Sequence, residues 1–325
     1  MTTAVGRTSG RAVAFVEPAL WSLVGNTPLV PLQLEPAVRP SARPPVCLKC
    51  EWTNPGGSVK DRAALAILRD GLARGELPHK RLLDASSGNT AIAYAVLGAA
   101  AGIGVTVCVP ASASAERKTL LEAYGAEVYF TDPLEGSDGA IREARRLAAL
   151  HADRFWYADQ YTHPANARAH YSTTAAEVWR DTARRVTHFV AGLGTTGTLM
   201  GAGRRLKELN PRIELVAVQP DRAFHGLEGL KHLDSAMVPG LYDPSVPDRH
   251  EFVGTEDAED MVRRLAREAG LLVGWSTGAA VVAALRVLSA GPPVRPSEPV
   301  VVVMAPDSGH RYLSEARRLR GPETP

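Results

Sequence analysis

The stretch from Asn54 to Arg62 reads Asn-Pro-Gly-Gly-Ser-Val-Lys-Asp-Arg. It follows a strand-like run at 46–51 and precedes an alanine- and leucine-rich helix predicted at 63–71. A proline and two glycines favour a tight turn, so Lys60 is expected at a strand-to-helix junction. A lysine near helix-end amides and partly out of water loses its proton more readily than a free one, and imine formation with an aldehyde requires a deprotonated amine. The alternative is a surface lysine in the first turn of a helix, and only the rest of the chain decides between the two.

Strand-like and helix-like segments alternate along most of the chain, as judged from apolar runs and from runs with one apolar face. The predicted strands lie at 82–85, 105–109, 127–131, 187–191, 213–218 and 300–304. The predicted helices lie at 91–101, 116–124, 137–151, 165–180, 199–209, 255–269 and 278–288. Such alternation indicates an α/β fold whose parallel sheets are covered on both faces, with sites at the carboxyl ends of the strands.

The length of 325 residues favours two domains. We expect two α/β domains, each a mostly parallel sheet flanked by helices, with the site in the cleft between them. The smaller, mobile domain is predicted at 46–162, and the larger one at 12–45 together with 163–320. Residues 1–11 and 321–325 are predicted to be flexible tails.

Composition excludes several classes of function. A net charge of +2 without a dense basic cluster gives no support for nucleic-acid binding, and no apolar run approaches the roughly 20 residues that span a bilayer. The three cysteines, without a signal peptide, predict a cytoplasmic protein. Cys47 and Cys50 form a C-x-x-C pair, but side chains three apart on a strand face opposite sides, so we expect no metal or redox site there.

Three loops that follow predicted strands are candidates for ligand binding. The loop at 192–198 matches G-x-G-x-x-G, in which glycines let the backbone approach a phosphate and the next helix directs its amides at the anion. A dinucleotide site is the rival interpretation, with Asp221 at the end of the next strand, and a glycine-rich turn without ligand is the third. The loops at 86–90 and 274–279 are rich in hydroxyl and amide groups that suit a carboxylate, or that simply cap the helices that follow.

Taken together, these motifs resemble those of the cysteine synthase and cystathionine β-synthase group of pyridoxal-phosphate enzymes, with the tryptophan-synthase-β-like fold (fold type II). The stretch around Lys60 resembles the family's lysine motif, 86–90 its Thr-Ser-Gly-Asn-Thr loop, and 194–198 its phosphate loop. Segments at 25–29, 160–166 and 274–278 also match. The resemblance extends from about residue 25 to residue 312, in the family's order.

The resemblance implies pyridoxal 5'-phosphate as cofactor and assigns a role to individual residues. Lys60 would hold the cofactor as an imine and then act as the base at the substrate α-carbon. Asn89 would bond the ring oxygen, and Ser276 would face the pyridine nitrogen. The cofactor phosphate would be held by Gly194, Thr195, Thr196, Gly197 and Thr198. The substrate carboxylate would be held by Ser86, Ser87, Gly88, Thr90 and Gln160.

The implied reaction is β-replacement: an O-activated L-serine loses its β-substituent to leave an aminoacrylate, and a sulfur nucleophile adds to give L-cysteine. Segments at 187–201 and 238–244 resemble the subgroup that uses O-phosphoserine, with sulfur from sulfide or a carrier protein's thiocarboxylate. Arg222 is the predicted phosphate partner, because a guanidinium suits a phosphate, unless it is an exposed loop arginine. The loop at 226–232 departs from the Gly-Ile-Gly-Ala-Gly-Phe loop of O-acetylserine enzymes, and its Lys231 or His232 is an alternative partner.

Other functions stay open at this point. A cystathionine β-synthase core or a 2,3-diaminopropionate synthase would use the same scaffold with a different nucleophile. A nicotinamide-linked dehydrogenase and an inactive homologue that serves as a binding partner belong to different classes. The family resemblance also implies a homodimer.

Overall fold

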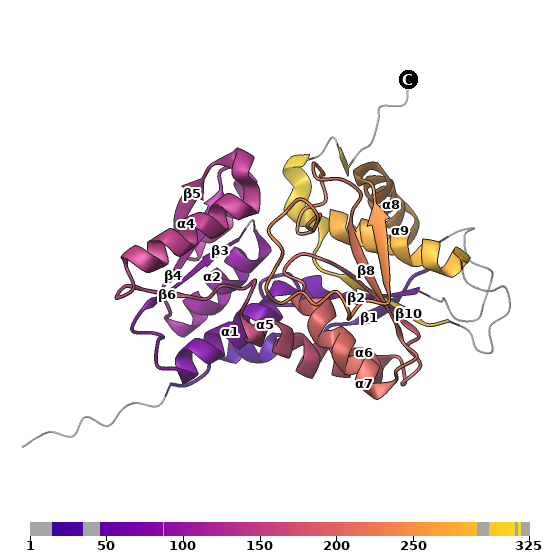
Figure 1. The fold of residues 1–325 in the computed structure, drawn as a ribbon, viewed down its shortest axis with the longest axis horizontal. Coiled ribbons are helices and arrows are strands. Elements are labelled where there is room, and N and C mark those ends of the chain that lie inside the picture. The colour runs from indigo at the N-terminus through magenta and orange to yellow at the C-terminus, as the bar shows by residue number, and fades with distance from the viewer. Residues whose placement is uncertain (1–14, 35–45, 87, 291–298, 316–317, 320–325) are drawn as a thin grey trace, which may run out of the picture.

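Two separate sheets organise the chain in this computed structural model, which describes residues 15–34, 46–86, 88–290, 299–315 and 318–319 (Figure 1). Among the described residues the larger sheet has six strands, and every neighbouring pair is parallel except β1 and β2. Its order is β1 (Leu29–Pro31), β2 (Val46–Cys50), β10 (Val301–Ala305), β7 (His188–Gly192), β8 (Glu214–Pro220) and β9 (Arg249–Val253).

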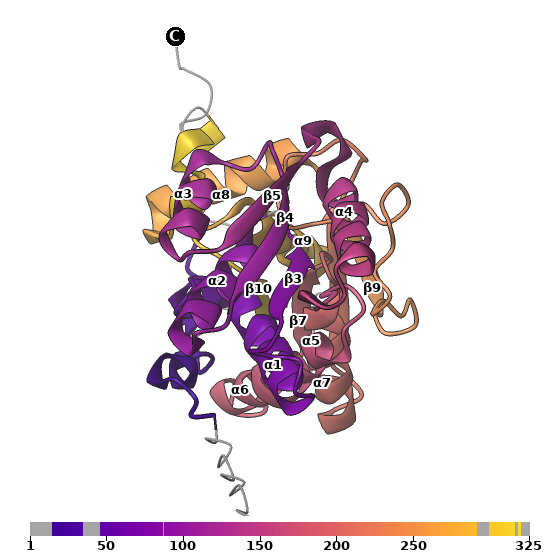
Figure 2. The same cartoon turned by 90° about the vertical axis from the view of Figure 1, so that its left-hand side faces the viewer.

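The smaller sheet has four parallel strands among the described residues. Its order is β5 (Glu127–Thr131), β4 (Val105–Pro110), β3 (Arg81–Ala85) and β6 (Phe155–Tyr157). Helices α2 (Asn89–Ala101) and α3 (Ala115–Ala123) lie on one side of this sheet and α4 (Gly136–Leu150) on the other, as Figure 2 shows. The predicted α/β class with two parallel-sheet units is therefore confirmed.

The remaining helices cover the larger sheet or join the two sheets. They are α1 (Lys60–Ala73), α5 (Pro164–Ala169), α6 (Ala175–Asp181), α7 (Arg204–Leu209), α8 (Thr255–Ala269) and α9 (Trp275–Ala290). Short 3₁₀ or π turns are η1 (Ala19–Leu23), η2 (Glu51–Thr53), η3 (Pro133–Glu135), η4 (His170–Thr174), η5 (Leu199–Gly203) and η6 (Gly309–Glu315). No helix of the described part has both the length and the apolar composition needed to cross a membrane.

Side chains on the central strands alternate between two cores. Val190 and Val216 face the core that α8 and α9 cover, whereas Phe189 and Leu215 face the core that α6, η5 and α7 cover. Because both faces of these strands are buried, their central positions are apolar, at 189–191 in β7 and 215–218 in β8. We call the four-stranded sheet with α1 to α4 the smaller half, and the six-stranded sheet with α6 to α9 the larger half.

The prediction that the smaller domain begins at residue 46 is wrong, because it assigns β2 to the smaller sheet. Val46 lies opposite Val301, so β2 belongs to the larger sheet. Pairing with a strand from the far end of the chain leaves no local signal in the sequence. The other domain boundaries stay predictions, and the predicted tails at 1–11 and 321–325 lie outside the described residues.

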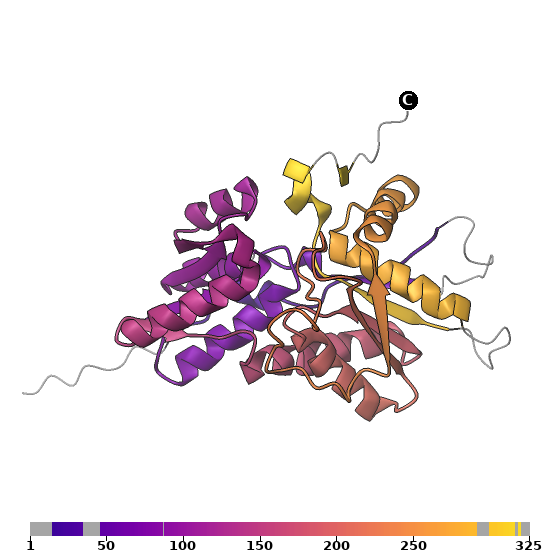
Figure 3. The same ribbon diagram turned by 45° about the horizontal axis from the view of Figure 1, so that its top comes forward.

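The C-terminal turn η6 lies between the two halves, where Figure 3 shows it beside the smaller one. The backbone amide of Ser314 donates to Glu116 Oε1 of α3 at 2.9 Å. The chain thus returns from the larger sheet to contact the smaller half, close to the ends of the strands that carry the predicted loops.

Candidate active site

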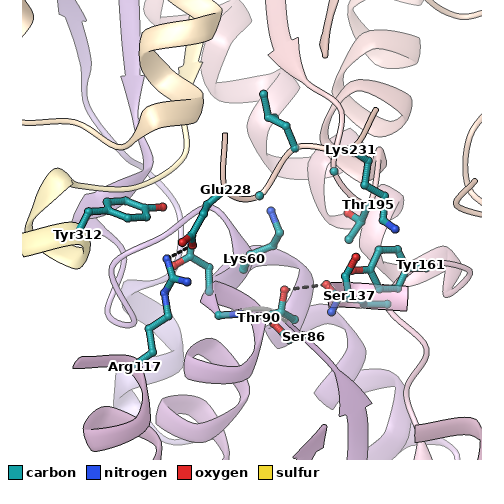
Figure 4. A pocket seen from close by; sticks show the side chains of 16 residues that line it. Lys60, Ser86, Thr90, Arg117, Ser137, Tyr161, Thr195, Glu228, Lys231 and Tyr312 are labelled. Atoms are coloured by element: carbon teal, nitrogen blue, oxygen red, sulfur yellow. Dashed lines mark hydrogen bonds and ion pairs between the residues drawn. The ribbon is translucent and has the colours of Figure 1, made fainter. Parts of the chain in front are cut away.

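A pocket opens between the halves, where the loops after β3, β6 and β7 meet. Figure 4 shows Lys60 in its centre, with Arg117 and Tyr312 on one side and Thr195 and Lys231 on the other. An adjoining cavity shares several of these residues and extends to Thr196, Thr198 and Ser276. The predicted lysine loop, phosphate loop and part of the carboxylate loop therefore converge on one place.

Lys60 is the first residue of α1, at the junction that the sequence predicts. Its removal from water lowers the pKa of the amine, although the negative charges of Asp307 and Glu51 oppose part of that shift. The backbone around it is tied to the larger sheet, because the Val59 amide donates to Pro306 O at 2.8 Å. A partly buried amine with a lowered pKa suits nucleophilic and basic chemistry.

A buried ion cluster fixes the first turn of α1 behind Lys60. The Arg62 guanidinium donates to Glu51 Oε2 at 2.7 Å and to both oxygens of Glu177, each at 2.7 Å. Lys49 Nζ lies 2.7 Å from Glu177 Oε2. Because Glu51 follows β2 and Glu177 lies on α6, the start of α1 is attached to the larger half.

The loop after β7 has features of a ligand site. Thr196 adopts a φ of +67°, and its Oγ1 is buried without a hydrogen-bond partner among the described residues. Such strain in a non-glycine residue persists where the surrounding structure demands it, often at functional sites. Gly194 has no room for a side chain, because a Cβ there would lie 2.2 Å from Gly229 O.

Two residues outside the predicted site set hold this loop. Asn166 Nδ2 donates to Thr195 Oγ1 at 3.1 Å. His170 Nε2 lies 3.3 Å from Thr198 Oγ1, and its Nδ1 lies 2.9 Å from Thr174 Oγ1. Burial and the positive charge of nearby Arg62 lower the pKa of His170 far below its usual range, so this imidazole is neutral. No sequence motif marks His170, although Asn166 lies in a segment that resembles the family.

The loop after β3 is arranged partly as a helix cap. Ser86 Oγ accepts from the amides of Gly88 and Ala91, both at 3.1 Å, which is the capping alternative considered above. Ser87 lies outside the described residues. Thr90 Oγ1 donates to Gln160 Oε1 at 2.7 Å, so both of these predicted residues lie together in the pocket wall.

Asp84, which the sequence does not single out, positions Gln160. Its Oδ2 accepts from the backbone amide of Gln160 at 3.2 Å and from the Tyr94 hydroxyl at 2.9 Å. Burial raises the pKa of Asp84 to about 7, despite hydrogen bonds that favour its charged form. The Gln160 side chain is also fixed, since its Nε2 donates to Ala85 O at 2.6 Å.

Asn89 and Ser276 border the same cavity as Lys60. Asn89, the first residue of α2, donates from Nδ2 to Asp307 Oδ2 at 2.6 Å, and its Oδ1 has no partner among the described residues. Ser276 lies in the first turn of α9 and is buried. Both residues therefore lie where the sequence predicts a cofactor.

Two ion pairs cross the pocket from one half to the other. Arg117 of α3 pairs with Glu228, as the dashed line in Figure 4 marks. Lys231 Nζ lies 2.7 Å from Asp138 Oδ1 of α4. Because Glu228 and Lys231 belong to one segment of the larger half, this segment closes one side of the pocket with charges of both signs.

The structure does not bring Arg222 into this pocket, contrary to the prediction. Its guanidinium bonds both oxygens of Asp221, at 3.1 and 3.2 Å, and its side chain is 58% exposed. It borders a separate open depression with Phe224 and Glu256. The carboxylate that precedes Arg222 in the chain holds it at the surface, so Lys231 is the predicted phosphate partner that does line the pocket. His232 bonds Ser235 Oγ at 2.8 Å.

The cysteines lie apart from this chemistry. Cys47 and Cys50 are free thiols on β2, and burial raises the pKa of Cys50 to about 12. Among the residues that the structure describes, no group of His, Cys, Asp or Glu is arranged to hold a metal ion.

The chain matches known proteins over most of its length. Residues 20–305 match the family described as pyridoxal-phosphate dependent enzyme. A cysteine synthase of Aquifex aeolicus is 47% identical over 298 residues, which cover 90% of each chain. An O-acetyl serine sulfhydrylase of Entamoeba histolytica has a similar structure, with a TM-score of 0.84 and 30% identity over 100% of this chain and 96% of that one. An O-acetylserine dependent cystathionine beta-synthase of Helicobacter pylori has a TM-score of 0.82 and 32% identity over 91% and 96%.

Proposed function

Because the chain belongs to the family of pyridoxal-phosphate-dependent enzymes, in its cysteine synthase and cystathionine β-synthase group, we propose that it forms L-cysteine by β-replacement on an O-activated L-serine. O-phosphoserine is the favoured donor, with O-acetylserine as the alternative. Sulfide or the thiocarboxylate of a carrier protein supplies the sulfur. The family assignment leaves no support for a nicotinamide-linked dehydrogenase.

The pocket residues fit pyridoxal phosphate. Thr196 Oγ1 and Asn89 Oδ1 are buried polar atoms without partners among the described residues, and both border the cavity, where a bound cofactor could supply a partner. The helix that begins after the loop at 194–196 directs its first amides at that loop, which suits a phosphate. The amine of Lys60 borders the same cavity.

When bound, pyridoxal phosphate withdraws electrons from the substrate α-carbon and so weakens its bond to hydrogen. Lys60 would hold the cofactor covalently and, once released, accept the α-proton, because burial lowers the pKa of its amine and so favours the unprotonated form. Gly194, Thr195, Thr196, Gly197 and Thr198 would bind the phosphate. Ser276 would face the pyridine nitrogen, and Asn89 the ring oxygen.

The substrate carboxylate would bind at the loop after β3. Thr90 and Gln160 line the pocket, and the Thr90 hydroxyl can move its hydrogen bond from Gln160 Oε1 to a carboxylate oxygen. Gln160 Nε2 donates one N–H to Ala85 O, so its second N–H remains to donate to the carboxylate. Ser86, Ser87 and Gly88 complete the proposed loop. The Ser86 hydroxyl already accepts two amides, so its own proton remains to donate to an anion.

The location of Lys231 is the observation that supports O-phosphoserine. Lys231 is buried in the pocket wall, and its ammonium group lies 5.2 Å from the centre of the Tyr161 ring. A phosphate on the substrate β-oxygen would carry more charge than a neutral acetyl group and would compete with Asp138 for this ammonium. Arg222, which the sequence suggests as the phosphate partner, is not assigned that role, because its side chain lies outside the pocket.

A stopped-flow spectrum of the holoenzyme mixed separately with O-phosphoserine and O-acetylserine tests the donor. We expect O-phosphoserine to shift the cofactor's visible band more rapidly at equal concentration. Lys231→Ala is expected to raise the KM for O-phosphoserine by about tenfold, and Arg222→Ala to leave it near wild type. A response to O-acetylserine alone would overturn the donor assignment, and a response to neither would overturn cysteine synthesis.

Products made with different nucleophiles separate this function from its relatives. Sulfide is expected to give cysteine, whereas preferred use of homocysteine would indicate a cystathionine β-synthase and preferred use of an amino-acid amine a 2,3-diaminopropionate synthase. The homodimer, the cytoplasmic location and the sulfur-carrier partner stay predictions. Light scattering on the purified protein measures its oligomeric state and so tests the predicted homodimer.

A further inference from the structure

Asp307 is a buried carboxylate that bonds Asn89 of the cavity wall, and apart from its charge near Lys60 it has no role in the proposed chemistry. It follows β10, and 1% of its surface is exposed. Its Oδ2 accepts from Asn89 Nδ2 at 2.6 Å and from the Tyr312 hydroxyl at 2.7 Å. Its backbone is held as well, because the Gly274 amide donates to Asp307 O at 3.1 Å.

The Asp307 carboxylate fits in its position only because residue 274 is a glycine. A Cβ at Gly274 would lie 2.0 Å from Asp307 Oδ1, so any other residue there would displace the carboxylate. Gly274 directly precedes α9, whose first turn contains Ser276. Asp307 therefore bonds Asn89 and packs against the glycine that precedes the helix of Ser276. Asn89 and Ser276 are two residues that the proposed function assigns to the cofactor.

The contact between Asp307 and Asn89 determines which way the asparagine amide is turned. An ionised carboxylate only accepts hydrogen bonds, whereas an asparagine amide has a donating and an accepting end. With Asp307 as its neighbour, the Asn89 NH₂ group faces the carboxylate, and the opposite orientation would bring two acceptor oxygens together. One N–H of Nδ2 then remains available for a ligand, and Oδ1 is held in a single direction.

The same contact joins the two halves of the molecule. Asn89 begins α2 of the smaller half, whereas Asp307 follows a strand of the larger sheet. Tyr312 extends the connection, since its ring lies 5.2 Å from the Arg117 guanidinium, which pairs with Glu228 across the pocket (Figure 4).

We propose that Asp307 is a positioning residue that fixes the amide orientation of Asn89 and thereby the contact of Asn89 with pyridoxal phosphate. The inference rests on the proposed role of Asn89. Asp307→Asn tests this proposal with little change in side-chain size. The new amide can donate to Asn89 Oδ1 and so permits the flipped orientation of Asn89, which the carboxylate disfavours.

A double-mutant cycle on the holoenzyme measures whether Asp307 acts through Asn89. The readouts are the position of the cofactor's visible band and the rate at which that band is lost after dilution into a cofactor scavenger. Asn89→Ala and Asp307→Asn are each expected to raise the rate of loss by about tenfold. The double variant is expected to lose cofactor no faster than Asn89→Ala alone, because the orientation of an absent amide cannot matter.

Two further variants make the result specific. Tyr312→Phe removes the other donor to Asp307 but keeps the contact with Asn89, so it is expected to change the rate less than Asp307→Asn. Asp260→Asn, a carboxylate on the exposed side of α8, is the matched control and is expected to behave as wild type. If Asp307→Asn does not fold, as judged by circular dichroism, Asp307→Ser takes its place in the cycle.

The outcomes separate this inference from the proposed function. If the increases in the rate of cofactor loss of the two single variants multiply in the double variant, Asp307 acts independently of Asn89. That result would overturn this inference and leave the proposed function standing. A wild-type rate and band for Asp307→Asn would do the same. A wild-type rate for Asn89→Ala would overturn both the proposed role of Asn89 and the inference that rests on it.

Discussion

Glu177 supports the position of Lys60, the proposed catalytic residue, although Glu177 does not line the pocket. Burial alone would raise the pKa of Glu177, but hydrogen bonds and charges from Arg62 and Lys49 outweigh it and lower the value from 4.5 to about 2. A carboxyl whose folded-state pKa is depressed stabilises the fold above its unfolded pKa. That contribution is lost as pH falls toward the folded value.

Glu177→Gln is expected to lower the free energy of unfolding by about 3 kcal/mol at pH 7, because it leaves two buried cations short of a partner. The difference from wild type should shrink as pH falls from about 4.5 towards 2. Urea denaturation followed by circular dichroism at several pH values measures it. Glu208→Gln is the matched control, since Glu208 pairs with Arg205 at the surface. A pH-independent difference would contradict the ionic explanation.

The sequence predicts site residues only where a local motif surrounds them. Lys60 lies in a recognisable turn, and its place at the start of α1 follows from the residues beside it. Asp84 and Asp307 act through partners distant in the chain, so no local pattern marks them. The chemistry of Arg222 and its place after a strand predict a phosphate contact, but the adjacent Asp221 holds its side chain at the surface.

At the scale of elements, the loop at 194–198 packs so closely against Gly229 that position 194 has no room for a side chain. Gly194→Ala would bring a Cβ to 2.2 Å from the backbone oxygen of Gly229, which cannot give way as a flexible side chain can. We expect the variant to lose cofactor about tenfold faster or more, with its fold retained. The visible band after gel filtration measures this loss.

Gly254→Ala provides the control for the loop. A Cβ at Gly254 would have no neighbour nearer than 3.4 Å, so this variant is expected to keep its cofactor as wild type does. Equal cofactor retention in Gly194→Ala and wild type would mean that the 226–231 segment moves aside without cost, and would argue against close packing as the reason for the glycine.

Elements with a clear apolar pattern are predictable from the sequence, and irregular ones are not. The helix at 255–269 has the predicted bounds, because its apolar face repeats along its whole length, and the strand at 127–131 also has the predicted bounds. β6 has three residues, and β9 is a half-polar edge strand, so neither gives a clear pattern. The π turns within the predicted helices at 165–180 and 199–209 also leave no mark in apolar periodicity.

At the scale of the whole molecule, the smaller half is proposed to move against the larger one when substrate binds. The pair between Asp138 and Lys231 opposes free movement of the 226–238 segment, and the Met237 amide also donates to Asp138, at 2.9 Å. Asp138→Asn weakens both contacts. We expect proteolysis within this segment to be about fivefold faster than in wild type.

Limited proteolysis with and without substrate, followed by mass spectrometry, measures the effect. Substrate is expected to protect wild type more strongly than the Asp138→Asn variant. Asp153→Asn, at an exposed position after α4, is the control. Equal protease sensitivity and cofactor fluorescence with and without substrate would count against movement of the smaller half.

The two ion pairs that cross the pocket have opposite polarity, and this has a consequence for discrimination between ligands. A cation of the smaller half meets Glu228, and a cation of the larger half meets Asp138. A ligand with a single anionic group can displace the carboxylate from only one of these cations. A ligand with two anionic groups at the spacing of these two cations can displace both carboxylates at once. The cleft would then respond to the coincidence of two negative groups at a set spacing, and an amino acid with a single carboxylate, however abundant, would leave one of the two pairs intact.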